Sequence, residues 1–231
     1  MFNQPTEPSS ESEPLPRLPG LDRAATPVVG VGLGIAGVLL GLRPRLAPLP
    51  LALAAAAALF LRDPDRQTPR GTGMLFAPAD GIVESFEEIY EHRFLHTDAL
   101  RIAIRVSALD VQVQRAPMAG RIAYMQQLDA KEPIGWALRS EAPAYGSCLL
   151  IGLETATLPM LIAIGAGPLI RRVSAQVSIG MEVHAGARLA TTRLGSHVDL
   201  IIPSEGLLGL PAVGSRVAAG MSMLGYAQMM P

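Results

Sequence analysis

The distribution of charged residues along the chain separates an apolar N-terminal part from a domain of short alternating segments. Residues 24–42 form a run of 19 without a charge, and after an arginine–proline corner residues 46–61 form another run of 16. A bilayer core of about 30 Å requires roughly 20 helical residues, so the first run is just long enough to cross it. Pro48 and Pro50 shorten the second helix. The pattern predicts an apolar helical hairpin over residues 24–62 that spans, dips into or lies on a membrane; a buried helical pair is the alternative.

The flanking regions have different compositions. Residues 1–23 are rich in Pro, Ser and Glu and have few large apolar side chains, which predicts a disordered tail. From residue 63 onward, short apolar runs with partial period-two alternation are interrupted by Gly and Pro, which predicts a mainly β domain over residues 63–231 of an α+β chain. The predicted strands are Ile82–Val83, Leu100–Val106, Gly120–Tyr124, Ser147–Gly152, Leu158–Ile164 and Leu169–Val177.

A short internal repeat refines this fold prediction. Gly180–Leu189 and Gly214–Met223 share the pattern G-x-x-V-x-A-G. Such a pattern is similar to the hairpin corners of barrel-sandwich domains. We therefore expect a barrel-sandwich-like β domain preceded by the apolar helical hairpin.

Composition excludes several classes of chemistry. A net charge of −1 gives no indication of nucleic-acid binding. The single cysteine, Cys148, excludes an internal disulfide and a cysteine-cluster metal site. His92 and His96 are four residues apart but lack a zincin glutamate and an evident third ligand, so no metal site is predicted. Lys131 is the only lysine, which disfavours bound pyridoxal and favours an internal carbonyl group for any chemistry on amines.

Gly195-Ser196 is the dipeptide best placed for self-cleavage. A serine that follows glycine in a strained turn can attack the preceding peptide bond through its hydroxyl and form an ester. Elimination then leaves dehydroalanine, which hydrolyses to a pyruvoyl group, an electron sink for amine substrates. Gly-Ser alone is usually an ordinary turn. Gly146-Ser147 lacks the Val-Asp that follows Ser196 after one residue, and Gly214-Ser215 belongs to a repeat corner.

Several motifs appear in a fixed order before this dipeptide. They are Phe60–Arg66, Phe76–Val83, Leu109–Pro117 and Ile164–Gly167 followed by Arg171-Arg172. In this order, from about Phe60 to about Pro203, the chain resembles the short form of phosphatidylserine decarboxylase. The resemblance implies decarboxylation of phosphatidylserine to phosphatidylethanolamine by a pyruvoyl group made from Ser196, at the cell membrane with the catalytic domain on the cytoplasmic side. Cleavage between Gly195 and Ser196 would give a β chain of residues 1–195 and an α chain of residues 196–231.

The resemblance also assigns roles to individual residues. Asp80 matches the acid of the family's P-A-D-G motif, although an Asp-Gly turn is its ordinary structural use. Arg115 matches the family's motif arginine and is expected to bind a phosphate or carboxylate of the substrate. Arg171 and Arg172 resemble a family pair, and strand alternation allows only one of them, here Arg172, to line a pocket. Solvated surface arginines are an equal alternative.

Gln112 is the main departure from the family pattern, which has histidine at this position. Glutamine forms hydrogen bonds but does not transfer protons near neutral pH. His197, next to Ser196, is a candidate replacement. The departure leaves a second hypothesis open, a non-decarboxylating membrane-bound homologue that binds lipid. A third is a structural adaptor with an anchor and an uncut chain, and homo-oligomerisation also stays open.

Overall fold

The chain divides into two units, residues 1–58 and 59–231. The computed structural model describes residues 20–22, 25–128, 147–167, 172–193 and 195–228. The tail predicted over residues 1–23 therefore lies almost wholly outside the described residues.

The first unit is a helical hairpin. It comprises α1 (Ala25–Leu42), the 3-10 turn η1 (Pro44–Leu46) and all but the last two residues of α2 (Pro48–Phe60). Helix α2 begins at Pro48 because the first turn of a helix needs no backbone donor from its first residues. A Cβ placed on Gly32 would lie 2.8 Å from the Ala54 Cβ, so glycine allows the two helices to approach closely here.

The outer surfaces of both helices are apolar. By length and composition, α1 is long enough to cross a membrane, with a mean hydropathy of 2.0 over its 18 residues. Only 17% of this segment is buried, which argues against a buried helical pair. The large apolar side chains exposed on the hairpin include Val31, Val38, Leu40, Leu42, Leu49 and Leu53.

The second unit is built mostly from strands, as predicted. The strands are β1 (Met74–Phe76), β2 (Gly81–Glu91), β3 (Thr97–Val106), β4 (Val113–Arg115), β5 (Gly120–Leu128), β6 (Cys148–Glu154), β7 (Met160–Ala166), β8 (Ser174–Ala175), β9 (Glu182–Val183), β10 (Arg188–Thr191), β11 (Ser196–Pro203), β12 (Leu207–Leu208), β13 (Arg216–Val217) and β14 (Met223–Ala227), with a 3-10 turn η2 (Ser204–Gly206) after β11.

One strand prediction is wrong in extent. Of the strand expected over Leu169–Val177, residues 168–171 lie outside the described part, and only Ser174–Ala175 pairs, as β8 with β10. The side chains of residues 174–176 are exposed, so no buried face extends the ladder. Each of the two G-x-x-V-x-A-G segments has turns on either side of a two-residue strand, β9 in the first and β13 in the second.

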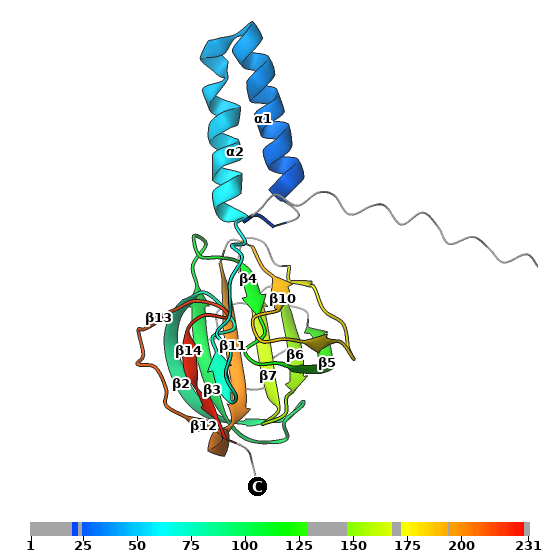
Figure 1. The fold of residues 1–231 in the computed structure, drawn as a ribbon, viewed down its shortest axis with the longest axis vertical. Helices are drawn as coiled ribbons and strands as arrows, with labels where there is room; N and C mark the ends of the chain where they lie inside the picture. Colours follow the sequence, from blue (N-terminus) through cyan, green and yellow to red (C-terminus); the bar gives the residue numbers. More distant parts are fainter. Residues whose placement is uncertain (1–19, 23–24, 129–146, 168–171, 194, 229–231) are drawn as a thin grey trace, which may run out of the picture. The chain divides into compact units, whose positions relative to one another are not determined.

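Strand order reveals two similar halves. The eight-stranded sheet has the order β13-β2-β3-β11-β7-β6-β5-β9, and two three-stranded sheets have the orders β1-β14-β12 and β4-β10-β8. Counting inward from both edges matches β13 with β9, β2 with β5, β3 with β6 and β11 with β7. The half formed by β4–β10 is continuous in sequence and is inserted between β3 and β11 of the other. Figure 1 shows β2 and β3 on one side of the central strands, and β6 and β5 on the other.

Strand β11 occupies the centre of the large sheet. It pairs antiparallel with β3 on one side and with β7 on the other. Its side chains alternate between two buried clusters: Val198, Leu200 and Ile202 belong to the larger one, and Ile201 to the smaller one. The alternation fixes which face each residue of β11 presents.

Candidate functional site

Ser196 is the first residue of β11 and is 9% exposed. Its backbone lies between Val106 of β3 and Ala166 of β7. Gly195, immediately before it, has a φ of +88°. An L-residue rarely adopts this left-handed conformation, so the turn requires glycine at this position.

A cluster of neutral polar side chains surrounds the Ser196 hydroxyl. Thr192 Oγ1 lies 3.1 Å from Ser196 Oγ. Gln114, on β4, donates from Nε2 to Thr192 Oγ1 at 3.0 Å. In the part of the chain that the structure describes, Thr192 is the only side chain hydrogen-bonded to Ser196 Oγ. The cluster therefore orients the hydroxyl without a group that titrates near neutral pH.

Gln112 holds the backbone of the same turn. Its Oε1 accepts a hydrogen bond from the Gly195 N–H at 3.0 Å, and its Nε2 donates to the carbonyl oxygens of Ser107 and Asp110. The Thr192 N–H donates to the Gln112 carbonyl oxygen at 2.9 Å. The Gln112 amide thus connects the segment before β4 to the residue that precedes Ser196.

Gln114 contains an unusual buried atom. Its side chain is fully buried, and its Oε1 has no hydrogen-bond partner among the described residues. A buried polar atom without a partner costs about 1–3 kcal/mol, so such atoms are rare in folded proteins. This acceptor lies on the residue that supports Thr192, and hence within the Ser196 cluster.

His197 faces away from this cluster. Successive residues of a strand point to opposite faces, so His197 lies on the other side of the sheet from Ser196. Its Nε2 is 3.0 Å from Asp199 Oδ1, and its Nδ1 is 3.5 Å from Glu84 Oε2. Burial raises the pKa of Asp199, but the hydrogen bonds and charges of His197 and Arg101 outweigh it and hold this pKa below its ordinary value.

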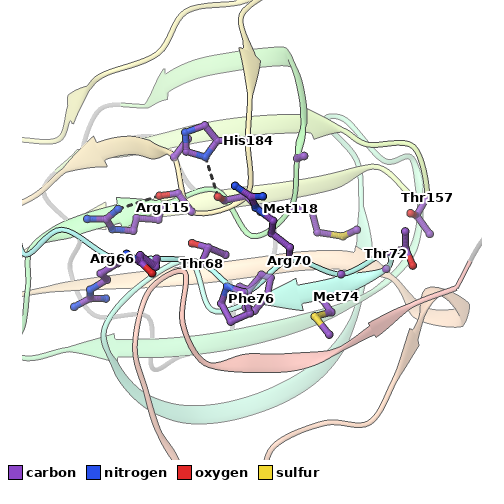
Figure 2. Close-up of a pocket in the computed structure, with 18 of the residues that line it drawn as sticks. Arg66, Thr68, Arg70, Thr72, Met74, Phe76, Arg115, Met118, Thr157 and His184 are labelled. Carbon is purple, nitrogen blue, oxygen red and sulfur yellow. Dashed lines mark hydrogen bonds between the residues drawn. The ribbon is translucent and has the colours of Figure 1, made fainter.

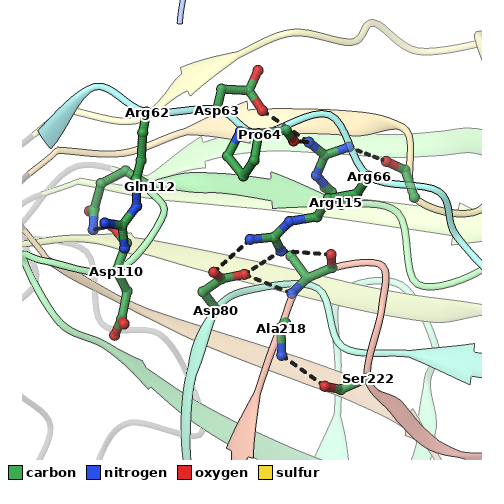
Figure 3. Close-up of polar contacts among 12 residues, drawn as sticks. Arg62, Asp63, Pro64, Arg66, Asp80, Asp110, Gln112, Arg115, Ala218 and Ser222 are labelled. Atoms are coloured by element: carbon green, nitrogen blue, oxygen red, sulfur yellow. Dashed lines mark hydrogen bonds and ion pairs between the residues drawn. The ribbon is translucent and has the colours of Figure 1, made fainter. Parts of the chain in front are cut away.

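Asp80 is held by an arginine and a backbone amide. Arg66 Nη1 and Nη2 lie 2.5 Å and 2.7 Å from the two carboxylate oxygens of Asp80. Figure 3 shows this pair of contacts. The Ala219 N–H donates to Asp80 Oδ1 at 2.8 Å. The carboxylate therefore ties together the segment after the hairpin, the turn before β2 and the corner before β14.

Arg115 is buried and engaged in a similar way. Its Nη2 donates to Asp63 Oδ1 at 2.9 Å and to the Pro64 carbonyl oxygen, and its Nη1 donates to the Gly186 carbonyl oxygen at 3.0 Å. Burial lowers the pKa of Arg115, and Asp63 acts in the opposite direction. Asp63 also accepts from Arg188 Nε at 2.6 Å. Arg172 is exposed, and Arg171 lies outside the described residues.

A groove of about 1270 Å³ lies beside these ion pairs, and Ser196 is not among its lining residues. Figure 2 shows the extended segment with Arg66, Thr68, Arg70 and Thr72 along one side, and His184 opposite. Arginines from three parts of the chain and the apolar side chains of Met74, Phe76 and Met118 contribute to its walls. It is therefore a feature separate from the serine cluster.

No group of three or more His, Cys, Asp or Glu side chains in the described part is arranged to hold a metal ion. Cys148 is buried, and desolvation raises the pKa of its thiol to about 12.

The sequence motifs selected Gly195, Ser196 and Gln112, and the structure places Gln112 against the Gly195 N–H. The motifs did not select Thr192 and Gln114. Nothing distinguishes a threonine or a glutamine in sequence from ordinary strand residues. Gln114 lies 78 residues before Thr192, so only the tertiary structure shows their contact. Arg66, the partner of Asp80, belongs to the Phe60–Arg66 motif, but the motif alone assigns it no role.

Comparisons with known proteins agree on one family. The sequence model of phosphatidylserine decarboxylase matches residues 53–225. A protein of Symbiobacterium thermophilum called phosphatidylserine decarboxylase proenzyme is 30% identical over 210 residues, covering 90% of this chain and 96% of the relative. Proteins with the same name from Chlorobium phaeovibrioides and Chlorobium luteolum are 32% and 33% identical, covering 85% and 75% of this chain and 89% and 82% of theirs. No solved structure matches the chain.

Proposed function

The chain belongs to the phosphatidylserine decarboxylase family, and from this premise we propose that it converts phosphatidylserine to phosphatidylethanolamine with a pyruvoyl group derived from Ser196. The observation that carries the proposal is the geometry of the Gly195-Ser196 turn. A left-handed glycine precedes a buried serine whose hydroxyl is held by Thr192.

The proposed self-cleavage uses only atoms of this turn and water. Ser196 Oγ attacks the carbonyl carbon of Gly195, the C–N bond to Ser196 breaks, and the hydroxyl proton is transferred to the freed amine, which leaves an ester. Loss of the Ser196 α-proton then expels the Gly195 carboxylate and gives dehydroalanine. Water converts this residue to a pyruvoyl group and releases ammonia. The buried position of Ser196 at the end of a central strand fits such a group.

The pyruvoyl group supplies a carbonyl that condenses with the substrate amine and accepts the electrons released as carbon dioxide leaves. The surrounding residues of this chain orient the reacting groups and exclude water. Thr192 fixes the Ser196 side chain, and Gln112 fixes the Gly195 amide. We propose that Arg172, which is exposed, contacts the anionic headgroup, while Arg115, with its guanidinium engaged by Asp63, acts by holding the site together.

The proton transfer expected of the family histidine needs another group in this chain. Gln112 cannot donate or remove a proton near neutral pH, and His197 faces the opposite side of the sheet. Asp80 matches the acid of the family motif and is paired with Arg66. We propose that Asp80 acts on the Gly195-Ser196 turn indirectly, through the ion pairs and hydrogen bonds that hold the domain together. The substitution at Gln112 also favours the second candidate function, a membrane-bound homologue that binds phospholipid without decarboxylating it.

We further propose that the helical hairpin anchors the chain in the cell membrane, with the β domain on the cytoplasmic side. The apolar side chains exposed along α1 and α2 support the anchoring, and the cytoplasmic side is proposed from the family resemblance alone. A substrate whose acyl chains lie in the bilayer then meets the catalytic domain at the level of its headgroup. The α and β fragments would remain associated, because β11 to β14 share sheets with strands of the larger fragment.

Intact mass spectrometry under denaturing conditions tests the cleavage. The wild-type chain is expected to give two fragments separated between Gly195 and Ser196, with a pyruvoyl group blocking the smaller one, whereas Ser196→Ala stays whole. A single full-length wild-type chain would refute the decarboxylase mechanism and favour the uncut adaptor.

Lipid turnover then separates the two functions that cleavage alone leaves open. Purified wild-type protein and Gln112→His are incubated with phosphatidylserine in mixed micelles, and phosphatidylethanolamine is measured. Activity in the wild type supports the decarboxylase. Activity confined to Gln112→His supports the lipid-binding homologue.

A further inference from the structure

The two halves of the β domain repeat a backbone arrangement around two Ala-Pro turns. The first turn is Phe76-Ala77-Pro78-Ala79-Asp80-Gly81, and the second is Arg115-Ala116-Pro117-Met118-Ala119-Gly120. They cross-pair symmetrically: the Phe76 N–H donates to the Pro117 carbonyl at 3.0 Å, and the Arg115 N–H donates to the Pro78 carbonyl at 2.8 Å. In this alignment Asp80 of the first turn corresponds to Ala119 of the second.

Each Ala-Pro turn is hydrogen-bonded to one of the two G-x-x-V-x-A-G corners. Ala77 accepts a hydrogen bond from the Gly220 N–H, and Ala116 accepts one from the Gly186 N–H, both at 2.8 Å. The corner glycines adopt matching conformations, with φ of +86° and +67° at Gly214 and Gly220, and +88° and +79° at Gly180 and Gly186. Because the backbones match, Ala219 of one corner corresponds to Ala185 of the other.

In the first half this arrangement binds a carboxylate. Asp80 accepts from the Ala219 N–H and from both terminal nitrogens of Arg66. A backbone amide and an arginine together make a charge-assisted site of the kind that holds carboxylates and phosphates.

In the second half the corresponding backbone donor, the Ala185 N–H, has no carboxylate beside it in the described part of the chain. Ala119 is exposed and supplies a methyl group where Asp80 supplies an anion. The Ala185 N–H has no acceptor among the described residues, and Arg70 has no acidic partner among them. Both residues line the groove, and Figure 2 shows Arg70 extending across it toward His184.

We propose that the groove binds an oxyanion, a carboxylate or phosphate group, between the Ala185 N–H and the Arg70 guanidinium. The other charged residues around it are already compensated: Arg66 by Asp80, Arg115 by Asp63, and Asp65 by Arg188. Arg70 therefore gives the groove its uncompensated positive charge. The anion comes either from a phospholipid headgroup or from a small free phosphate.

The site is separate from Ser196, so its test does not depend on cleavage or decarboxylation. Binding of inorganic phosphate and of soluble glycerophosphoserine is measured by calorimetry on the full chain, and repeated on the uncut Ser196→Ala chain. Ala119→Asp places a carboxylate where the first half has one, and Arg70→Gln removes the cation. Arg121→Gln, which removes an exposed arginine outside the groove, is the matched control.

Ala119→Asp and Arg70→Gln are each expected to weaken binding about tenfold or more, as loss of a charge-assisted hydrogen bond predicts, and Arg121→Gln to leave it unchanged. Tighter binding of glycerophosphoserine than of phosphate assigns the site to a headgroup, and equal binding assigns it to free phosphate. The proposal is overturned if the wild-type chain binds neither probe, or if both groove variants bind them like wild type. Ala119→Asp changes an exposed residue, so this arm stays informative even if Arg70→Gln fails to fold.

Discussion

Replacing Thr192 by valine tests whether the neutral polar cluster prepares Ser196 for cleavage. Valine keeps the volume and branching of threonine but removes the hydroxyl that contacts Ser196 Oγ at 3.1 Å and accepts from Gln114 Nε2 at 3.0 Å. A neutral hydrogen bond contributes about 0.5–1.5 kcal/mol, so losing the one that orients Ser196 slows cleavage by about 2- to 13-fold.

The same change has a separate cost in stability. Gln114 is fully buried and its Oε1 already lacks a partner, so Thr192→Val leaves the Nε2 donor unpaired as well. An unsatisfied buried donor costs about 1–3 kcal/mol, which for a chain of this size lowers Tm by about 2–12 °C.

Cell-free synthesis in detergent gives precursor whose cleavage is followed over time by intact mass. Thr191→Val is the matched control, because Thr191 is an adjacent buried threonine whose hydroxyl accepts from Gln176 Nε2, whereas Thr192 is the threonine bonded to Ser196 Oγ. We expect slower cleavage in Thr192→Val than in Thr191→Val. A folded Thr192→Val chain that cleaves at the wild-type rate would refute the reasoning.

Three further predictions follow from buried groups. Asp63→Asn leaves the Arg115 charge buried without its partner and is expected to lower the free energy of unfolding by about 3–5 kcal/mol; a thermal melt like that of wild type would contradict this. Because the folded pKa of Asp199 is depressed, its contribution to stability is present above about pH 4 and is lost as the pH falls through the folded pKa. Denaturant unfolding across the acid range is therefore expected to lose less stability in Asp199→Asn than in wild type, and equal losses would count against it. Cys148, buried with a thiol pKa of about 12, is expected to react with a thiol reagent at neutral pH only after unfolding, and rapid labelling of the native protein would disprove this.

The strands could largely be predicted from sequence because their apolar runs are local. Leu100–Val106 and Leu158–Ile164 contain enough alternating or continuous apolar residues to identify β3 and β7. The prediction of a long strand was wrong over residues 172–177, because the side chains there are mostly exposed and pack on no buried face. The helical hairpin was equally evident, since its apolar runs lack any charge.

The site was harder to predict because its contacts join distant segments. Gln112 and Gly195 are 83 residues apart, and the inserted half of the domain lies between them. The resemblance to the family motifs selected both Gln112 and Gly195, but it could not show that His197 faces the other side of the sheet. That conclusion needed the observation that β11 already begins at Ser196, which makes His197 its second residue. Thr192 and Gln114 carry no chemical signal in sequence, so only their contacts mark them.

The central position of β11 has a consequence for the new chain terminus that the proposed cleavage would create. A new chain terminus normally frays, because its first residues lack neighbours on one or both sides. Here the terminus would begin at a residue flanked by Val106 and Ala166, inside an existing ladder. Cleavage would therefore create a reactive N-terminus that stays ordered. The two fragments would behave as an obligate heterodimer whose subunits are already associated when they form.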